Sequence, residues 1–360
     1  MFQQAQSERL LSIVSIPDPT RKRSSPTPAE PRATLVMVAA RAGVSKSTAG
    51  YVLSGQEQRM RISEQTRHRV LRAAAEMNYR PNVMARSLRT TVTRPIALIS
   101  DTLASEAYGG ELIEGCVSAA AECGRLTFIG ETRRDPALQA ALVEEFLAEQ
   151  AVDFVFASVY PRELTLPDGL NRARVVMLNC AAGEPGVPCV LPDELAAGRT
   201  AADILLDQGV AERVWVLGDR APHGYAPGRD RETGLRHGLL AGGHEVAALF
   251  DCAWEPEPAY EALKSALAAG ETPTALVAMN DRVALGAYQA LAEAGRRIPD
   301  DVSVLAFEGS NLAGWLRPQL TTVDRPLRSM ARLAIRHLAG EERLEGVTRV
   351  PPAVRRRLSV

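Results

Sequence analysis

The sequence predicts an α/β fold in which a short helical module precedes a larger core built on parallel sheets. Three observations lead to this prediction. Residues 33–54 carry apolar side chains at helical spacing on both sides of a glycine. From residue 94 onward, short apolar runs alternate with helical segments, as expected for strands buried on both faces of a parallel sheet. The chain of 360 residues is also longer than one usual domain, so we expect two or three folding units.

The module at residues 33–54, ATLVMVAARAGVSKSTAGYVLS, is predicted to be two helices joined by a tight turn. Gly43 tolerates the left-handed backbone that ends the first helix, and Ser45 is a suitable N-cap for a second helix from Lys46 to about Leu53. The residues expected to face inward are Val36, Val38, Ala39, Ala42, Ala49, Val52 and Leu53, which leaves Lys46, Ser47, Gly50 and Tyr51 facing outward. This pattern is typical of a helix-turn-helix.

A third helix is predicted after this pair, from Glu64 to about Asn78 with Ser63 as its cap. Its apolar positions are Val70, Leu71, Ala74 and Met77. An ordinary helical hairpin inside a core is the alternative interpretation of the first two helices, but the sequence that follows argues against it. TL..VA..AGVS..T...VL from Thr34 to Leu53, NYRPN from Asn78 and A.SL from Ala85 stand in an order that resembles the LacI/GalR family of bacterial transcriptional repressors. The resemblance covers everything after residue 32.

The resemblance implies that the second helix lies in the major groove of double-stranded DNA. The DNA-binding residues expected there are Ser45, Lys46, Ser47, Thr48 and Tyr51. Lysine can donate to guanine O6 or N7, and hydroxyl groups can contact base edges or phosphates. Gly50 and Tyr51 depart from the Ser and Arg that are usual in the family, so the preferred operator is expected to differ.

The segment at residues 80–93 resembles the hinge of the family. Asn82 is a good N-cap, but an isolated helix of about eight residues is unstable in water and needs a partner. The resemblance implies that this helix forms when two copies meet on the operator, that Leu88 wedges into the minor groove, and that Arg86 and Arg89 bind phosphates. The alternative for Leu88 is a place in a core.

Charge is divided unevenly along the chain. Residues 1–94 hold 16 Lys and Arg against 6 Asp and Glu, whereas the remainder holds 26 against 37. A basic end of this kind binds phosphates with strong salt dependence. Residues 1–32 are rich in Pro, Ser and Arg and lack apolar periodicity, so we expect a disordered extension that is either inert or an extra basic arm on DNA.

Several classes of protein are excluded by missing patterns. No apolar run approaches the roughly 18 residues of a membrane span, and no export signal is recognisable, so a cytoplasmic, nucleoid-associated protein is expected. The five cysteines form no CxxC pair and are expected to be reduced thiols, with no metal site and no cofactor. Neither a nucleotide-binding fingerprint nor a nucleophile motif such as GxSxG occurs, so we expect no enzyme.

The core at residues 94–360 is expected to contain seven strands that the apolar runs mark, and helices near residues 111–123, 136–150, 196–208 and 281–294. The runs are PIALISD, RLTFIGE, VDFVFAS, RVVMLNC, RVWVLGD, TALVAMND and VSVLAFE. The resemblance implies a periplasmic-binding-protein-like core of two Rossmann-like subdomains with three crossovers. The N-subdomain would span about 94–190 and 324–348, and the C-subdomain about 191–323 and 349–360. The helix-turn-helix domain would occupy residues 33–79.

Ligands of such a core bind at the carboxyl ends of strands. The effector-binding residues expected there are Asp101, Tyr108, Arg231, Trp254, Asn280 and Glu308. Their carboxylates, amide, guanidinium and rings suit a small polar effector, such as a carbohydrate. Each has an alternative: Asp101 and Asn280 as helix caps, Arg231 in a surface ion pair, and Trp254 in the core.

Two departures from the family concern this site. DTLASEAYGG after the first strand is about two residues longer than usual. In AFEG, Glu308 replaces a ligand-binding Asp, and Gly309 leaves the next carboxylate absent. An effector larger or smaller than an aldohexose, or not a sugar, is therefore compatible with the site.

The resemblance implies a homodimer, because the chain stops after the last strand without a heptad tail. Two-fold symmetry then predicts a pseudo-palindromic operator. The expected function is that of a repressor whose DNA binding is controlled by an effector in the core. The alternative is a solute-binding protein without DNA-specific function.

Overall fold

The computed structural model describes residues 33–53, 57–58, 60–77, 79, 94–103, 109–160, 162–170, 173–183, 185–218 and 227–360. The chain forms two compact units, Met1–Val92 and Thr93–Val360. The predicted extension at residues 1–32 and the predicted hinge helix lie outside the described residues. None of the described helices is long and apolar enough to cross a lipid bilayer.

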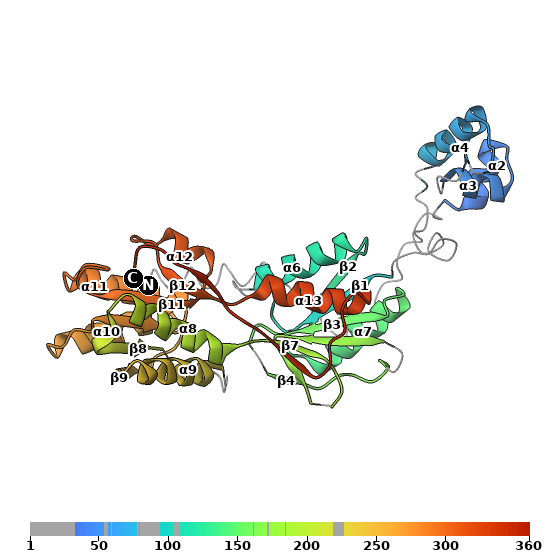
Figure 1. The fold of residues 1–360 in the computed structure, drawn as a ribbon. Coiled ribbons are helices and arrows are strands. Elements are labelled where there is room, and N and C mark those ends of the chain that lie inside the picture. The colour runs from blue at the N-terminus through green and yellow to red at the C-terminus, as the bar shows by residue number, and fades with distance from the viewer. Residues whose placement is uncertain are drawn as a thin grey trace, which may run out of the picture. The chain divides into compact units, whose positions relative to one another are not determined.

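The described residues of the first unit form three helices, α2 (Leu35–Ala42), α3 (Lys46–Leu53) and α4 (Glu64–Glu76) (Figure 1). Gly43 has φ of 63° and ends α2 in the left-handed conformation. The Ser45 hydroxyl accepts a hydrogen bond from the Thr48 backbone N–H at 3.1 Å, and Ser63 caps α4 in the same way through Thr66. The predicted caps of both helices and the turn between α2 and α3 are confirmed.

The core of this small unit is narrower than the sequence predicted. Its buried residues are Val38, Ala39, Ala42, Ala49, Val52, Val70, Ala73 and Ala74. The predicted burial of Val36 and Leu71 is wrong, since their side chains are 55% and 38% exposed. Val36 lies two positions before Val38, about 200° around the helix axis, so it points away from the buried stripe.

The described part of the second unit contains two six-stranded sheets and one two-stranded sheet. The first has the order β13-β7-β5-β3-β1-β2, and all its strand pairs are parallel. Its strands are β1 (Ile96–Ser100), β2 (Thr127–Glu131), β3 (Asp153–Ala157), β5 (Arg174–Leu178), β7 (Cys189–Pro192) and β13 (Val347–Val350). The helices α6 (Gly109–Glu122) and α13 (Leu327–Ala339) pack on one face, and α7 (Pro136–Ala148) packs on the other. Two short strands, β4 (Glu163–Leu164) and β6 (Ala181–Ala182), form a separate two-stranded parallel sheet.

The second sheet has the order β14-β12-β11-β10-β8-β9, and only the edge strand β14 is antiparallel. Its strands are β8 (Val214–Leu217), β9 (Val246–Phe250), β10 (Ala275–Ala278), β11 (Ser303–Glu308), β12 (Thr321–Asp324) and β14 (Ala353–Arg355). The helices are α8 (Glu194–Asp207), α9 (Pro227–Ala241), α10 (Pro256–Ala268), α11 (Asp281–Glu293) and α12 (Asn311–Trp315), with the 3₁₀ turn η1 (Ala211–Arg213). Figure 1 shows α8 and α9 on one face of this sheet and α10 and α11 on the other. The predicted parallel α/β architecture is confirmed.

The chain passes between the two sheets three times. β7 of the first sheet leads into α8 of the second subdomain, β12 leads back into α13, and β13 is followed by β14. In both sheets the strand order reverses at one point, between β1 and β3 in the first and between β8 and β10 in the second. Ligands of open α/β sheets bind at the carboxyl ends of strands at such points. The two reversals therefore define where a ligand site is expected.

Candidate nucleic-acid interface and effector site

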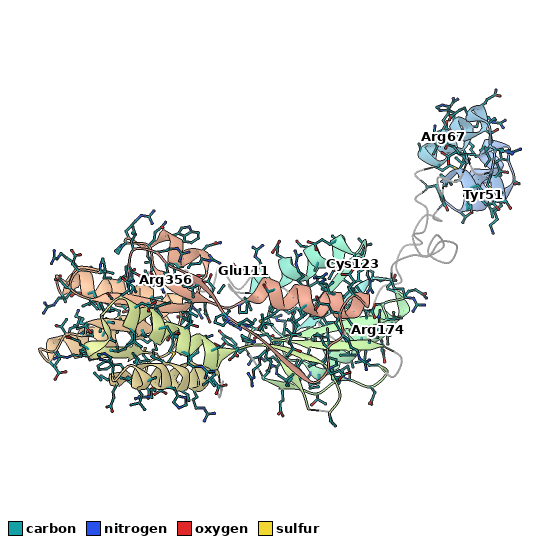
Figure 2. The ribbon with its side chains drawn as sticks, in the orientation of Figure 1. Tyr51, Arg67, Glu111, Cys123, Arg174 and Arg356 are labelled. Carbon is teal, nitrogen blue, oxygen red and sulfur yellow. The ribbon has the colours of Figure 1, made fainter. Side chains whose placement is uncertain are left out.

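The outward face of α3 is polar and free of acidic residues. Lys46 and Ser47 are exposed, and Thr48 and Tyr51 are half-buried. Tyr51 is labelled in Figure 2. The hydroxyls of Ser45 and Thr48 lie 2.8 Å apart and take part in the helix cap. Lys46 and Ser47 therefore remain the side chains best placed to reach a nucleic acid, while Ser45 and Thr48 fix the start of the helix that carries them.

α3 packs against α2 and α4, and an ion pair joins these two helices to each other. Ala49 is completely buried between α2 and α4. Arg41 of α2 pairs with Glu76 of α4 at 2.9 Å. Such rigid support is what a groove-reading helix requires, because base contacts depend on a fixed register.

Arg231 lies at the reversal point of the second sheet and is completely buried. Its Nη2 donates to Glu194 Oε1 at 2.8 Å, and its Nη1 donates to the Met279 carbonyl at 2.9 Å. The guanidinium also lies over the rings of Trp254 and Phe307, at 5.3 and 5.1 Å from their centroids. The alternative of a surface ion pair is wrong: the ion pair is buried.

Close helix packing creates this arrangement. A Cβ on Gly198 of α8 would lie 2.0 Å from the Arg231 carbonyl oxygen, and a Cβ on Gly234 of α9 would lie 2.1 Å from that of Leu195. Only glycine permits backbones to approach so closely. The two helices therefore bring Glu194 and Arg231 together as one buried pair.

Asn280 and Trp254 belong to the same group. The Asn280 side-chain oxygen accepts from the Val283 N–H at 2.8 Å and caps α11, while its Nδ2 donates to the Trp254 carbonyl at 3.3 Å. Trp254 is buried in the core of the second subdomain. Both residues thus have the structural roles that were their alternatives, and their ligand roles stay predictions.

Glu308 ends β11 with φ of 88° and a side chain that is 6% exposed. Its Oε1 lies 3.6 Å from Arg325 Nη1, and its Oε2 has no hydrogen-bond partner among the described residues. Burial raises the pKa of this carboxyl. Burial also raises the pKa of Asp281 to about 7, although its Oδ2 accepts from the Ser310 N–H.

The space over Gly309 is occupied by a carboxylate from the neighbouring strand β12. A Cβ on Gly309 would lie 1.8 Å from Asp324 Oδ1, and Gly309 has φ of 74°. Asp324 is 4% exposed and pairs with Arg355. Gly309 itself carries no carboxylate, and Asp324 of β12 occupies the volume that a side chain at this position would fill.

Asp101 lies at the reversal point of the first sheet. Its carboxylate accepts from Ser158 Oγ at 2.7 Å and from the Thr102 N–H at 2.8 Å. Arg162 Nε and Arg134 Nε lie 3.2 and 3.9 Å from its Oδ2. Asp101 binds β3 and its own strand end and caps no described helix. Tyr108 lies outside the described residues.

Arg325 is a site residue that the sequence analysis did not single out. It follows β12 on the second crossover and is 8% exposed. Its Nη2 donates to Asn179 Oδ1 at 3.1 Å and to the Val159 carbonyl at 3.4 Å, both in the first subdomain, while Nη1 faces Glu308 of the second. A charged residue directly after the buried run TTVD, at a predicted crossover, was the available signal.

A cavity of about 570 Å³ opens beside Arg325 and Glu308, and we call it the effector cavity. Its other lining residues are Gly110, Glu111, Arg282, Ser310, Asn311, Leu312, Trp315, Leu327 and Arg328. Glu111 lies at the start of α6 (Figure 2). The volume falls within the range of about 300–1,000 Å³ that is usual for small-molecule sites.

A helix-turn-helix unit joined to a two-subdomain α/β core with a cavity defines a class of protein, the DNA-binding transcriptional regulators with a ligand-binding core. Comparison with known sequences agrees. Residues 34–82 match the model of bacterial regulatory proteins of the lacI family, and residues 202–360 match a periplasmic binding protein-like domain. The chain is 32% identical over 328 residues to the transcriptional regulator CelR of Thermobifida fusca, which covers 86% of this chain and 93% of that protein. It is 30% identical to the sucrose operon repressor of Escherichia coli, over 89% and 97% of the two chains. This protein belongs to the lacI family of bacterial transcriptional regulators.

Solved structures show the same fold. The lac repressor dimer bound to operator and the anti-inducer ONPF aligns with a TM-score of 0.73 at 22% identity, over 91% of this chain and 99% of that one. The complex of the regulator CelR with cellobiose aligns with a TM-score of 0.56 at 25% identity, over 91% and 100%.

Proposed function

We propose that this protein is a cytoplasmic repressor that binds a pseudo-palindromic operator as a homodimer and responds to a small polar effector in the effector cavity. The observation that carries the proposal is the capped helix α3, with Lys46 and Ser47 exposed on a face free of acidic residues. Lys46, Ser47 and Tyr51 would read base edges, and Ser45 and Thr48 would set the register.

Exposed apolar residues support the dimer. Leu126 and Ile129 of the edge strand region at β2 are 66% and 44% exposed, Val117 of α6 is 41% exposed, and Trp315 of α12 is 72% exposed. Large apolar side chains that cluster on neighbouring elements mark interaction surfaces. A second copy packed on α6 and β2 would cover three of them. The two hinges would then meet, with Asn82, Arg86, Leu88 and Arg89 in the DNA-binding roles expected for them.

Effector control would act through the relative position of the two subdomains. Arg325 contacts both, so a ligand that binds beside it would favour one arrangement over the other. The coupling free energy of such systems is typically about 1–3 kcal/mol. The relatives include a regulator in complex with cellobiose and a sucrose operon repressor, which supports a carbohydrate-like effector. Asp101, Tyr108, Arg231, Trp254, Asn280 and Glu308 remain the proposed effector-binding residues.

Two other classes receive less support. A solute-binding protein without DNA-specific function would not need a capped helix with an outward polar face that carries a lysine and no acidic residue. We also propose that the protein is no enzyme, since its relatives are transcriptional regulators. Incubation of the purified protein with candidate sugars, followed by product analysis, tests this point, and turnover of any of them would contradict it.

The test of the DNA function is selection of bound sites from random duplex DNA, followed by titration of the best site at several salt concentrations. An enriched palindrome is expected, with affinity that falls steeply as salt rises. Leu88→Ala should weaken binding to that palindrome at least about tenfold if the wedge contributes its few kcal/mol. Enrichment of no sequence would contradict the proposed operator recognition.

A further inference from the structure

We infer that the effector is a polyhydroxylated anion, a small molecule that carries a carboxylate or phosphate group beside several hydroxyl groups. The inference rests on the proposed function, because it concerns the same cavity. It is carried by the incomplete charge compensation of Arg325 and by carboxylate oxygens that lack partners near it.

Arg325 is a buried cation without a hydrogen-bonded anion. The only carboxylate within 4 Å of it among the described residues is Glu308, at 3.6 Å and beyond normal hydrogen-bond distance. Its two hydrogen bonds go to neutral acceptors, the Asn179 side chain and the Val159 carbonyl, and its Nε has no partner. A buried charge is costly unless it is paired and hydrogen-bonded. An anionic group in the cavity that Arg325 lines would complete its coordination.

Two more guanidinium groups adjoin this one. Arg162 donates from Nε to Ser158 Oγ at 3.4 Å, and Arg325 donates to the carbonyl of the next residue, Val159. Arg162 and Arg134 share one carboxylate, that of Asp101. The three guanidinium groups therefore lie against two buried carboxylates, those of Asp101 and Glu308, which leaves one positive charge in excess where Arg325 meets the first subdomain.

Arg134 sits in an unusual turn. Arg133 and Arg134 both have positive φ, at 53° and 64°. Non-glycine residues in this conformation are uncommon and occur preferentially at functional sites. The Arg133 N–H donates to the Asp101 carbonyl at 2.7 Å, so the turn is fixed to the strand end that carries the shared carboxylate.

Hydrogen-bond acceptors also lie at this cavity. Glu308 Oε2 and Asp281 Oδ1 are buried and have no partner in the described part of the chain. Glu308 lines the cavity, and Asp281 is bound to Ser310, which also lines it. Unpartnered carboxylate oxygens suit ligand hydroxyls, which can donate to them. A ligand that places an anionic group at Arg325 and hydroxyl groups at Glu308 is a sugar acid or a sugar phosphate.

Neutral and cationic ligands fit less well. A neutral sugar would satisfy Glu308 but would leave the Arg325 charge without a hydrogen-bonded anion. An amino sugar would pair with Glu308 but would add a positive charge beside the arginines. Both classes are therefore included as competitors in the test.

The experiment is isothermal titration of the full-length protein with D-gluconate, D-galacturonate and D-glucose 6-phosphate, with D-glucose, D-galactose and D-glucosamine as matched ligands. At least one anion should bind about tenfold or more tightly than its uncharged parent, and its affinity should fall as NaCl is raised. The carboxylate and phosphate arms distinguish the two sources of the anion. Arg325→Gln and Arg162→Gln should each weaken anion binding about tenfold or more. Arg343→Gln, at an arginine that is 86% exposed, is the control and should change nothing.

Arg162→Gln keeps the test valid if Arg325→Gln fails to fold, because Arg162 is partly exposed. Equal or tighter binding of the neutral sugars or of D-glucosamine would overturn the inference and leave the proposed regulator intact. Failure of all three anions to bind below about 1 mM would also overturn it. Operator selection is independent of these outcomes, so a failure of DNA recognition would be recognised separately.

Discussion

The guanidinium of Arg125 donates from Nε to the carbonyl oxygen of Arg94 at 2.6 Å, directly after the segment predicted to be the hinge. The same guanidinium reaches the carbonyl of Leu338 near the end of α13 at 3.4 Å and pairs with the buried Asp153. α13 begins two residues after Arg325. One helix thus runs from the effector cavity to the point where the chain enters the core.

Removal of Arg125 should destabilise the core strongly. Arg125→Met leaves the buried carboxylate of Asp153 with Arg174 as its only ionic partner among the described residues. Loss of one partner of a buried pair typically costs about 3–5 kcal/mol. Arg174→Gln is the matched control, because Arg174 binds the same carboxylate but is 54% exposed and should cost about 1 kcal/mol or less. Urea denaturation followed by circular dichroism measures both. Equal losses in the two variants would show that burial does not set the strength of this pair.

Gly309→Ala should be destabilising for two separable reasons. The backbone φ of 74° costs about 1–2 kcal/mol for a residue with a Cβ, and the new Cβ would collide with Asp324. Gly340→Ala measures the first cost alone, since Gly340 has φ of 80° and nothing within 4 Å of a Cβ. Unfolding free energies should therefore fall more for Gly309→Ala than for Gly340→Ala. In an Asp324→Ala background, the additional destabilisation of Gly309→Ala over Gly340→Ala should largely vanish. If this difference persisted, the collision with Asp324 would not be its source.

The sequence predicted those features that depend on neighbours along the chain. The caps at Ser45 and Ser63 and the turn at Gly43 follow from local hydrogen bonds, and the apolar runs predict strands because each is buried on both faces. Contacts between segments that lie far apart in the chain could not be predicted from the sequence. Asp324 fills the space over Gly309, and Arg325 bridges two subdomains, through strand register and a crossover that no local pattern reveals. Val36 was misassigned because periodicity in eight residues leaves the direction of a narrow apolar face uncertain.

Asp281 should make stability fall as pH rises. Burial raises its pKa in the folded protein to about 7, above the ordinary value near 3.9, so the folded state holds its proton where the unfolded state has lost it. The free energy of unfolding therefore falls between about pH 4 and pH 7, by up to about 1.4 kcal/mol for each pH unit. Above about pH 7 this contribution is constant. Asp281→Asn should remove this slope, whereas Asp300→Asn, at an aspartate whose side chain is 62% exposed, should not. Urea titrations across this pH range compare the variants, and parallel curves for wild type and Asp281→Asn would exclude the effect.

Lys46→Ala should weaken binding to the selected operator and relax its sequence preference. Lys46 is the first residue of α3, is exposed, and follows the Ser45 cap that fixes its direction. Loss of a base-edge contact costs about 1–3 kcal/mol and acts at one position of each half-site, whereas loss of a phosphate contact weakens all sequences alike and lowers the salt slope by about one unit. Fluorescence anisotropy with the operator and with single-base variants distinguishes the two cases.

The control for this prediction is Arg343→Gln, because Arg343 belongs to the core unit and should leave both affinity and salt slope unchanged. Ser45→Ala is the complementary variant. It keeps Lys46 but removes the hydroxyl that accepts from the Thr48 N–H, which costs about 1 kcal/mol of helix stability, so operator affinity should fall without a change in preferred sequence. A uniform loss across all base variants in Lys46→Ala would assign Lys46 to the phosphates and leave base reading to Ser47 and Tyr51.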